Sequence, residues 1–103
     1  MAAPPEIFTV TALLWRWKSA TAPASWYFIT IDPGTAMAIR AEAFDRMGRW
    51  KSVKVSAVIG ETRWQTSLFP HKESGGFLMP VKAAVRKAEG IGEGDDVTVS
   101  LEI

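Results

Sequence analysis

The chain has 103 residues and a mass of 11.3 kDa, the size of one domain with one hydrophobic core. Its 48% hydrophobic and 22% charged residues are typical of a globular protein and argue against a disordered chain. The absence of cysteine excludes disulfides, thiolate zinc sites and cysteine nucleophiles, and a single histidine excludes a multi-histidine metal site. A formal net charge of +1 at pH 7 gives no strong electrostatic preference for a partner.

Two β-rich segments open the chain. Residues 7–17 and 26–31 are rich in β-branched and aromatic side chains, which predicts two strands joined by a loop over residues 18–25. Residues 1–6 lack the basic and apolar regions of a secretory signal, and no uncharged run is long enough to span a bilayer. We therefore expect a flexible segment at residues 1–6, a single domain over 7–103, and a soluble, cytoplasmic protein without membrane association.

A helix and a third strand complete the first half. Asp32 and Pro33 have the pattern of a helix start, with Asp as N-cap and Pro at the first helical position. Gly48 is the expected stop, and apolar residues lie between at helical spacing: Ala36, Ile39, Ala43 and Met47. Residues 52–59 alternate between apolar and polar side chains, which predicts a strand with one buried face.

The second half repeats this order. Residues 63–69 predict a strand, residues 70–76 a hairpin loop, and residues 77–79 the returning strand. A second helix is expected to begin at Pro80 and to end at Gly90, with its apolar face at Val81, Ala84, Val85 and Ala88. After a turn, the buried face of the last strand is expected at Val97, Val99, Leu101 and Ile103.

The two halves suggest an internal duplication. Residues 53–59 (VKVSAVI) and 97–103 (VTVSLEI) agree at two valines, a serine and the terminal isoleucine. Each segment follows an aromatic strand, a proline and an amphipathic helix. Two such halves can share one core as a closed pseudo-twofold barrel, although any two β–helix–β segments share some of this pattern.

The second half resembles the AbrB/MazE-type swapped hairpin. The resemblance is carried by residues 76–88 (GFLMPVKAAVRKA), by Gly90-Ile91, by the turn Glu93-Gly94-Asp95 and by the alternation of Val97 and Val99. Members of that group are usually half this length and dimerise to complete a double-split β-barrel. The resemblance implies that one chain with two halves completes the barrel alone.

From about Phe8 to Ile103, the chain more specifically resembles a family of small bacterial domains of unknown function, similar in fold to AbrB and sometimes fused to a YdeI/OmpD-associated segment. The motifs that carry this resemblance are residues 12–15 (ALLW), 26–28 (WYF), 59–60 (IG), 63–70 (RWQTSLFP) and 78–82 (LMPVK). It implies a mainly β fold, a closed double-split β-barrel with two short helices, and no established activity.

No catalytic or cofactor site emerges from the sequence. Ser67 and His71 are four residues apart, but no acid is placed to orient the imidazole, and we expect an ordinary loop histidine. Asp95 and Asp96 lack the spacing of a calcium loop, and the AbrB resemblance implies that Asp95 bonds the turn backbone. The glycines near them follow a helix instead of opening one, so they do not form a phosphate loop. We expect no enzyme, no metal and no cofactor.

The five tryptophans are the most distinctive feature: Trp15, Trp17, Trp26, Trp50 and Trp64. Most are expected in the core, because a small barrel needs bulky side chains. Trp17 and Trp50 lie beside basic residues and are the candidates for exposure, where a flanked tryptophan suits a peptide, nucleic acid or carbohydrate.

Two functions follow, with different residues. The first is a non-enzymatic binding module for an unknown protein or small-molecule ligand, whose candidate residues are Trp17, Arg63, His71 and Lys72. The alternative is an AbrB-like DNA-binding transcriptional regulator that uses Arg40, Arg49, Lys51, Lys82 and Arg86. The net charge of +1 disfavours this alternative, because DNA-binding domains usually carry a clear basic excess. A closed barrel has no free sheet edge, so we expect a monomer.

Overall fold

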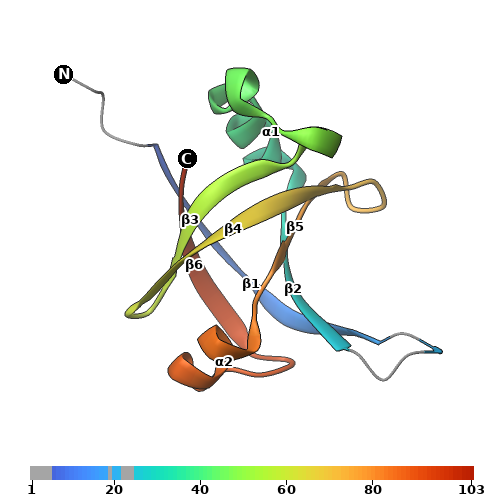
Figure 1. The fold of residues 1–103 in the computed structure, drawn as a ribbon, viewed down its shortest axis with the longest axis vertical. Helices are drawn as coiled ribbons and strands as arrows, with labels where there is room; N and C mark the ends of the chain where they lie inside the picture. Colours follow the sequence, from blue (N-terminus) through green and yellow to red (C-terminus); the bar gives the residue numbers. More distant parts are fainter. Residues whose placement is uncertain (1–5, 19, 22–24) are drawn as a thin grey trace.

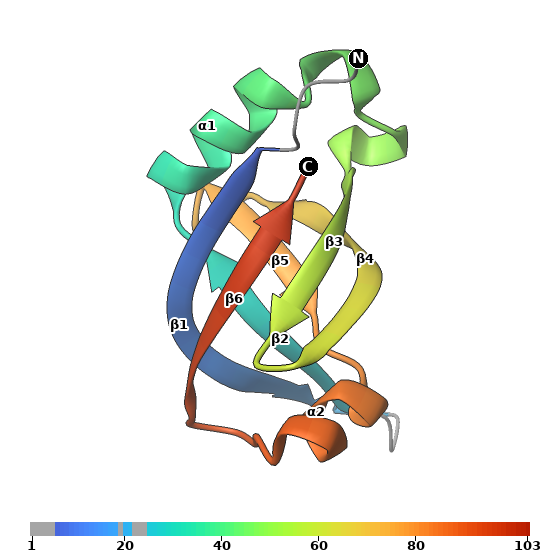
Figure 2. The same ribbon diagram turned by 90° about the vertical axis from the view of Figure 1, so that its left-hand side faces the viewer.

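Six antiparallel strands form a closed barrel in the computed structural model, which describes residues 6–18, 20–21 and 25–103 without the side chain of Arg49. Around the barrel the strands follow the order β1-β2-β5-β4-β3-β6 (Figures 1 and 2). The elements are β1 (Ile7–Lys18), β2 (Ser25–Ile31), α1 (Pro33–Glu42), η1 (Phe44–Arg46), η2 (Arg49–Lys51), β3 (Val53–Ile59), β4 (Thr62–His71), β5 (Gly76–Pro80), α2 (Ala83–Glu89) and β6 (Asp96–Glu102). The expected mainly β fold with a closed barrel is confirmed.

The two longest strands, β1 and β4, each belong to two sheets. The first part of β1 pairs with β6 and its last part with β2, while β4 pairs first with β3 and then, over its last three residues, with β5. Exchanging the two halves of the chain maps the β1–β2 pairing onto β4–β5 and the β1–β6 pairing onto β4–β3, and it leaves the β2–β5 and β3–β6 pairings in place. This arrangement agrees with the two-half interpretation of the sequence; a duplication in the ancestry of the chain stays a prediction.

The barrel interior is filled mainly by aliphatic side chains at alternate strand positions. In β3 the apolar positions expected from the sequence all point inward: Val53, Val55, Ala57 and Ile59. Leu14 of β1, Ile29 of β2, Leu68 of β4 and Met79 of β5 are fully buried beside them. Because side chains alternate across a strand, the neighbours of these residues point outward, which decides where the surface described below can form.

Helix α1 covers one end of the barrel (Figures 1 and 2). Its start is as expected: the Asp32 carboxylate accepts the N–H of Thr35 at 2.9 Å, and Pro33 is the first helical residue. The expected helical course to Met47 is wrong, because α1 ends at Glu42 and the chain continues in the tighter turn η1. This turn redirects the chain toward β3 and still packs Met47 against the core.

Helix α2 covers the opposite end and begins three residues later than expected (Figures 1 and 2). Pro80 belongs to β5 and lies opposite Phe28 in the ladder with β2. The N–H of Val81 donates to the Tyr27 carbonyl, so a donor at position 80 would point toward β4, where the β4–β5 ladder has already ended. Proline, which has no backbone N–H, is tolerated there because an N–H at this position would have no strand partner.

The apolar face expected for this helix is only half correct. Val85 is buried and Val81 is buried just before the helix, whereas the other two expected positions, Ala84 and Ala88, are exposed. Gly90 ends α2 as expected, with a left-handed φ of +63°. The Thr62 hydroxyl donates to the Glu89 carboxylate at 2.6 Å and ties this end of the helix to β4.

Both ends of the β4–β5 hairpin extend further than expected. Pro70 lies opposite Phe77, and His71 lies opposite Gly76, so the connection comprises only residues 72–75. Of the expected flexible segment 1–6, residues 1–5 lie outside the described residues, and the Glu6 carbonyl accepts the N–H of Ile103 at 3.0 Å. Part of the expected loop 18–25 also falls outside the described residues.

Candidate functional site

Aromatic side chains gather on the outer face of the β1-β2-β5-β4 sheet. The ladder sets Trp17 opposite Trp26, and Trp15 opposite Phe28. The same row continues across β5, since Phe28 lies opposite Pro80. Leu78 of β5 lies opposite Phe69 of β4 and extends the apolar surface toward the hairpin. Strand register therefore joins side chains that are far apart in the sequence into one surface.

These side chains enclose an open groove of about 730 Å³, here called the aromatic groove. Its lining residues come from four strands and the hairpin: Trp15, Trp17, Trp26, Phe28, Phe69, His71, Glu73, Leu78 and Pro80. Trp17, Trp26 and Phe69 are 47%, 54% and 45% exposed. A contiguous apolar patch of this kind on a protein surface usually marks an interaction site.

The base of the aromatic groove is held in place by contacts within the sheet. The Trp15 and Phe28 ring centroids are 5.2 Å apart, and Trp26 stacks on Phe28 at 6.3 Å with an interplanar angle of 12°. The Trp15 indole N–H donates to the Thr30 hydroxyl at 2.8 Å. Because Trp26 is held by this stacking, its exposed part offers apolar surface to a ligand at little further cost in side-chain entropy.

Most tryptophans are not in the core, contrary to the expectation from the sequence. Only Trp64 is buried, whereas Trp15 is half-buried and the other three are exposed. Trp17 and Trp50 are exposed as expected, and Trp50, at 86%, lies in η2 away from the aromatic groove. The expectation failed because aliphatic side chains already fill the barrel.

A second hollow, of about 350 Å³, lies next to the groove at the end of the barrel that α1 covers, and we call it the cationic pocket. Its lining comprises Arg40, Lys51, Pro70, His71, Lys72 and Gly75. The Arg40 guanidinium lies 4.6 Å from the centroid of the Phe77 ring. Among the described residues, no carboxylate forms an ion pair with the three permanent cations of this pocket.

His71 lines both the aromatic groove and the cationic pocket. Its Nδ1 atom is in hydrogen-bonding contact with the Ser74 hydroxyl at 2.8 Å, which orients the ring. The hydroxyl of Ser74 also accepts the N–H of Gly76 at 3.2 Å, so the imidazole is tied to the hairpin backbone. The imidazole thus has Ser74 as its partner, while Ser67 lies four residues earlier on β4; His71 itself ends this strand and does not lie in the expected hairpin loop.

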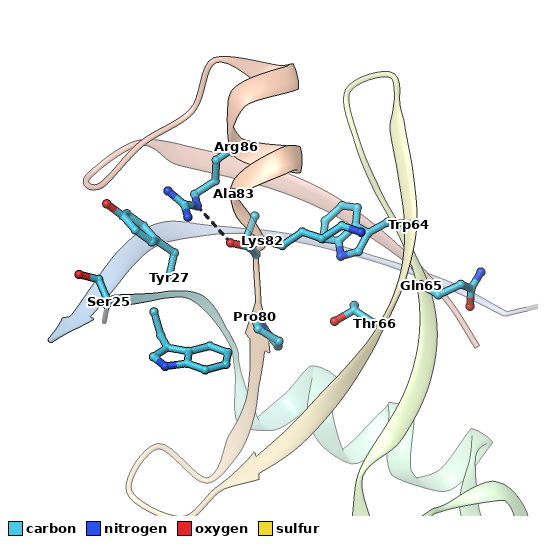
Figure 3. Close-up of a pocket in the computed structure, with 11 residues that line it drawn as sticks. Ser25, Tyr27, Trp64, Gln65, Thr66, Pro80, Lys82, Ala83 and Arg86 are labelled. Carbon is cyan, nitrogen blue, oxygen red and sulfur yellow. Dashed lines mark hydrogen bonds between the residues drawn. The ribbon is translucent and has the colours of Figure 1, made fainter. Parts of the chain in front are cut away.

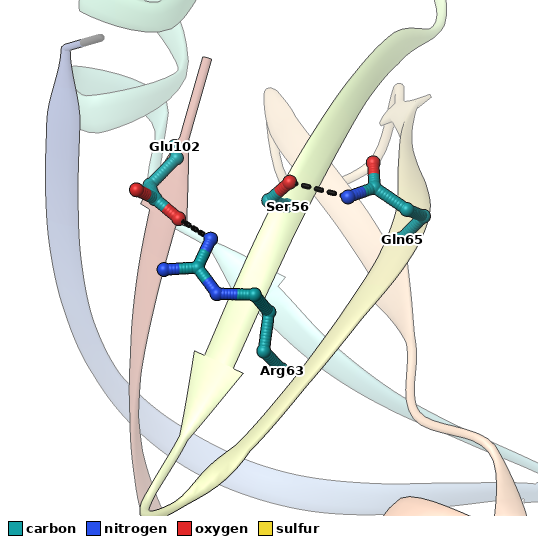
Figure 4. A network of polar contacts seen from close by, with 4 residues as sticks. All are labelled: Ser56, Arg63, Gln65 and Glu102. Carbon is teal, nitrogen blue, oxygen red and sulfur yellow. Dashed lines mark hydrogen bonds and ion pairs between the residues drawn. The ribbon is translucent and has the colours of Figure 1, made fainter. Parts of the chain in front are cut away.

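Arg63 does not join the other candidate ligand-binding residues. It lies near the start of β4, eight residues before His71, which corresponds to roughly 27 Å along an extended strand. Its guanidinium forms an ion pair with Glu102 of β6, next to the Gln65–Ser56 hydrogen bond (Figure 4). Trp17 and His71 do share the aromatic groove, while Lys72 lies in the cationic pocket.

The basic residues of the DNA-binding alternative are divided between the two ends of the barrel. Arg40 and Lys51 line the cationic pocket at the α1 end. Lys82 and Arg86 line a pocket of about 440 Å³ beside α2, the mouth pocket (Figure 3). The side chain of Arg49 lies outside the described residues. The structure therefore does not bring these candidates together on one face.

Arg86 is already engaged within the protein. Its guanidinium lies 3.6 Å from the centroid of the Tyr27 ring, and its Nε donates to the Val81 carbonyl at 3.1 Å (Figure 3). Trp64 also lines the mouth pocket but is only 8% exposed. Arg86 and Trp64 are therefore occupied within the protein, whereas Trp26, which lines this pocket as well as the aromatic groove, is exposed.

In the part of the chain that the structure describes, no three His, Asp or Glu side chains gather in a way that could hold a metal ion. The Asp95 carboxylate accepts the N–H of Gly92 at 2.8 Å, the role that the AbrB resemblance implied. The pKa of Asp32 lies below its ordinary value because its carboxylate accepts the backbone N–H and then the hydroxyl of Thr35. Asp32 caps α1 and lines none of the three hollows described above.

Most of the aromatic groove was missed in the sequence. Trp26, Phe28, Phe69, Leu78 and Pro80 were not among the candidates, although they form most of its surface. One signal was present: residues 26–31 are apolar at nearly every position, including those that alternate with buried Ile29 and Ile31. Apolar residues on both sides of a strand indicate either two buried faces or one exposed binding face.

Comparison with known proteins relates nearly the whole chain to a family model. Among the described residues, neither helix is long and apolar enough to cross a membrane. A search of curated proteins found no match to this sequence. The similarity in fold to AbrB stays a prediction. Residues 11–101 match the model of the family described as Domain of unknown function (DUF1905), and the chain belongs to this family.

Proposed function

We propose that this protein is a non-enzymatic binding module whose ligand places a flat apolar group in the aromatic groove. The observation that carries the proposal is the alignment of half-exposed Trp17, Trp26 and Phe69 on one outer face of the sheet. These side chains point away from the core, so the barrel does not need their bulk in order to fold.

The size and chemistry of the aromatic groove suit a small molecule. Its volume of about 730 Å³ lies within the range of about 300 to 1,000 Å³ typical of small-molecule sites. Its surface is mostly aromatic, with a few polar groups at the hairpin end, where His71 and Glu73 lie. Such a surface favours stacking with a flat ring, and the polar groups can orient the ligand.

The DNA-binding alternative has less support. Its described basic residues lie at opposite ends of the barrel, and one of them, Arg86, stacks on Tyr27. A protein that grips duplex DNA needs several cations in reach of one backbone track. The mouth pocket is also the weaker candidate for a small ligand, because two of its three aromatic rings are covered: Trp64 is buried and Tyr27 lies under Arg86. The third ring, that of Trp26, belongs to the aromatic groove as well.

The experiment compares two exposed tryptophans. Adenosine and indole serve as neutral, flat probes, and an NMR titration gives their Kd for the wild type and for the W17A and W50A variants. Stacking on one aromatic side chain contributes about 1–3 kcal/mol, so we expect W17A to weaken binding about tenfold. W50A is the matched control, because Trp50 is exposed but lies outside the aromatic groove.

The proposal fails if neither probe binds in the millimolar range, or if W17A and W50A have the same effect. Circular dichroism of each variant establishes that the barrel is intact before binding is compared. Turnover of either probe during the titration would contradict the non-enzymatic part of the proposal.

A further inference from the structure

The aromatic groove and the cationic pocket meet at His71, which lines both. We infer that they form one bipartite site for a small molecule that carries a phosphate group on a flat ring system. The ring lies in the groove and the phosphate in the pocket. This inference rests on the proposed function, because it names the ligand class of the same groove.

The cationic pocket has the charge to hold a dianion. Arg40, Lys51 and Lys72 bring three permanent positive charges to it, and no carboxylate lines it. A phosphate monoester carries close to two negative charges at neutral pH, twice the charge of a carboxylate. The net charge of the whole chain is only +1, so this cluster is a local feature and not the result of a basic composition.

The donors of the pocket come from three separate elements. Arg40 lies in α1, Lys51 in η2, and His71 at the end of β4, with Lys72 directly after it. The guanidinium carbon of Arg40 lies 4.6 Å from the centroid of the buried Phe77 ring, a cation–π contact that holds this cation beside the pocket. Part of the side-chain entropy of Arg40 is therefore lost before any ligand arrives.

The backbone next to Lys51 provides an independent observation. Trp50 and Lys51 adopt φ values of +61° and +58°, the left-handed region that residues other than glycine rarely occupy. Unfavourable backbone conformations of this kind are concentrated at binding and active sites. Here the strained turn delivers the Lys51 side chain to the lining of the cationic pocket.

Glu73 determines the orientation of the ligand and argues against a polymer. Its carboxylate is at the hairpin end of the aromatic groove, whereas the pocket beyond His71 has no acidic lining. A phosphate in the groove would lie beside Glu73 and be repelled by it, whereas a phosphate in the pocket would lie among Arg40, Lys51 and Lys72. A single-stranded nucleic acid lying along the groove would place further phosphates near this carboxylate, so the charges favour a ligand with one phosphate group.

Three probes test the inference by NMR titration at low and at physiological salt: AMP, adenosine and inorganic phosphate. AMP carries both parts of the expected ligand, adenosine only the ring, and phosphate only the anion. We expect AMP to bind at least tenfold more tightly than adenosine, and this advantage to shrink as salt screens the cations. K51A and K72A should each reduce the advantage, while K54A, an exposed lysine of β3 outside the pocket, should leave it unchanged.

Each other outcome has a distinct meaning. Equal binding of adenosine and AMP would overturn the bipartite site and leave the proposed function standing. If W17A leaves AMP binding unchanged and free phosphate binds as tightly as AMP, the pocket is a separate anion site and the inference is wrong. If a thymidine oligonucleotide binds much more tightly than AMP, the ligand is a single-stranded nucleic acid and the inference of a small molecule is wrong. If neither adenosine nor AMP binds, the inference is wrong, and the proposed function falls with it only if indole does not bind either.

Discussion

Trp17 of β1 and Trp26 of β2 lie directly opposite each other in the antiparallel ladder, and 47% and 54% of their surfaces are exposed. Directly opposed residues on one face of a sheet are the closest cross-strand neighbours. Trp26 stacks in turn on Phe28, so the exposed pair continues into the half-buried base of the aromatic groove. Two large apolar residues are thus held in a fixed arrangement on the surface.

The tryptophans should separate clearly by their effect on stability. W64A removes a buried ring from the barrel and should lower the free energy of unfolding by about 3–5 kcal/mol. W17T keeps a β-branched side chain at an exposed strand position and should cost about 1 kcal/mol or less. Urea denaturation measures both. A loss for W17T as large as that for W64A would show that Trp17 supports the fold and not a ligand.

The N-cap of α1 should give the protein a specific response to acid. The pKa of Asp32 is depressed in the folded state, so its charged form stabilises the fold above the ordinary pKa of 3.8. That contribution is lost as the pH falls through the lower folded pKa. D32A should therefore cost about 1 kcal/mol at neutral pH, and the difference from wild type should vanish in strong acid.

The D32N variant is the control for this prediction. Asparagine also accepts the N–H of Thr35, so D32N should keep most of the stability at neutral pH while losing the pH dependence. Thermal unfolding followed from pH 7 down to about pH 2 compares the three proteins. A D32A deficit that persists unchanged at the lowest pH would contradict the role of the charge.

Gly76, at the base of the β4–β5 hairpin, should tolerate no side chain. A Cβ atom there would lie 1.8 Å from the Ile31 carbonyl oxygen, which belongs to rigid backbone. G76A should force β2 and β5 apart and cost about 3 kcal/mol or more. G92A is the matched control, because nothing lies within 4 Å of its added Cβ. Similar melting temperatures for the two variants would mean that Gly76 does not lie against the Ile31 carbonyl.

Two variants that each introduce one aspartate, V85D and A84D, test which face of α2 is buried. Val85 is 1% exposed, so V85D buries an unpaired carboxylate and should cost several kcal/mol. Ala84, its neighbour, is exposed, and A84D should change the stability by less than about 1 kcal/mol. Chemical denaturation of both variants gives the comparison. Wild-type stability of V85D would mean that another face of α2 packs on the barrel.

Local patterns in the sequence predicted the elements well where a single force determines them. The strict alternation in residues 53–59 identified the buried side of β3, and Asp32-Pro33 marked the start of α1. Pro80 misled because proline is favoured at the first position of a helix and equally tolerated at a strand position without a partner. Only the neighbouring strand decides between the two.

The site was harder to predict because it depends on register. Trp17 and His71 were among the candidates from the sequence, but only strand pairing shows that they share the aromatic groove with Phe28 and Phe69. Arg63, another candidate from the sequence, lies far from this groove and forms an ion pair with Glu102. The composition of a small barrel also does not reveal which tryptophans face outward, since both faces of β1 and β2 carry apolar residues.

The measurement that tests the central claim most directly follows the five tryptophan indole N–H signals of ¹⁵N-labelled protein during titration with adenosine. Trp17 lines only the aromatic groove, Trp64 only the mouth pocket, and Trp50 neither. We predict that the Trp17 signal shifts in a saturable manner while the Trp64 and Trp50 signals stay in place. A saturable shift of Trp64 without one of Trp17 would contradict the account and move the binding site to the mouth pocket beside α2.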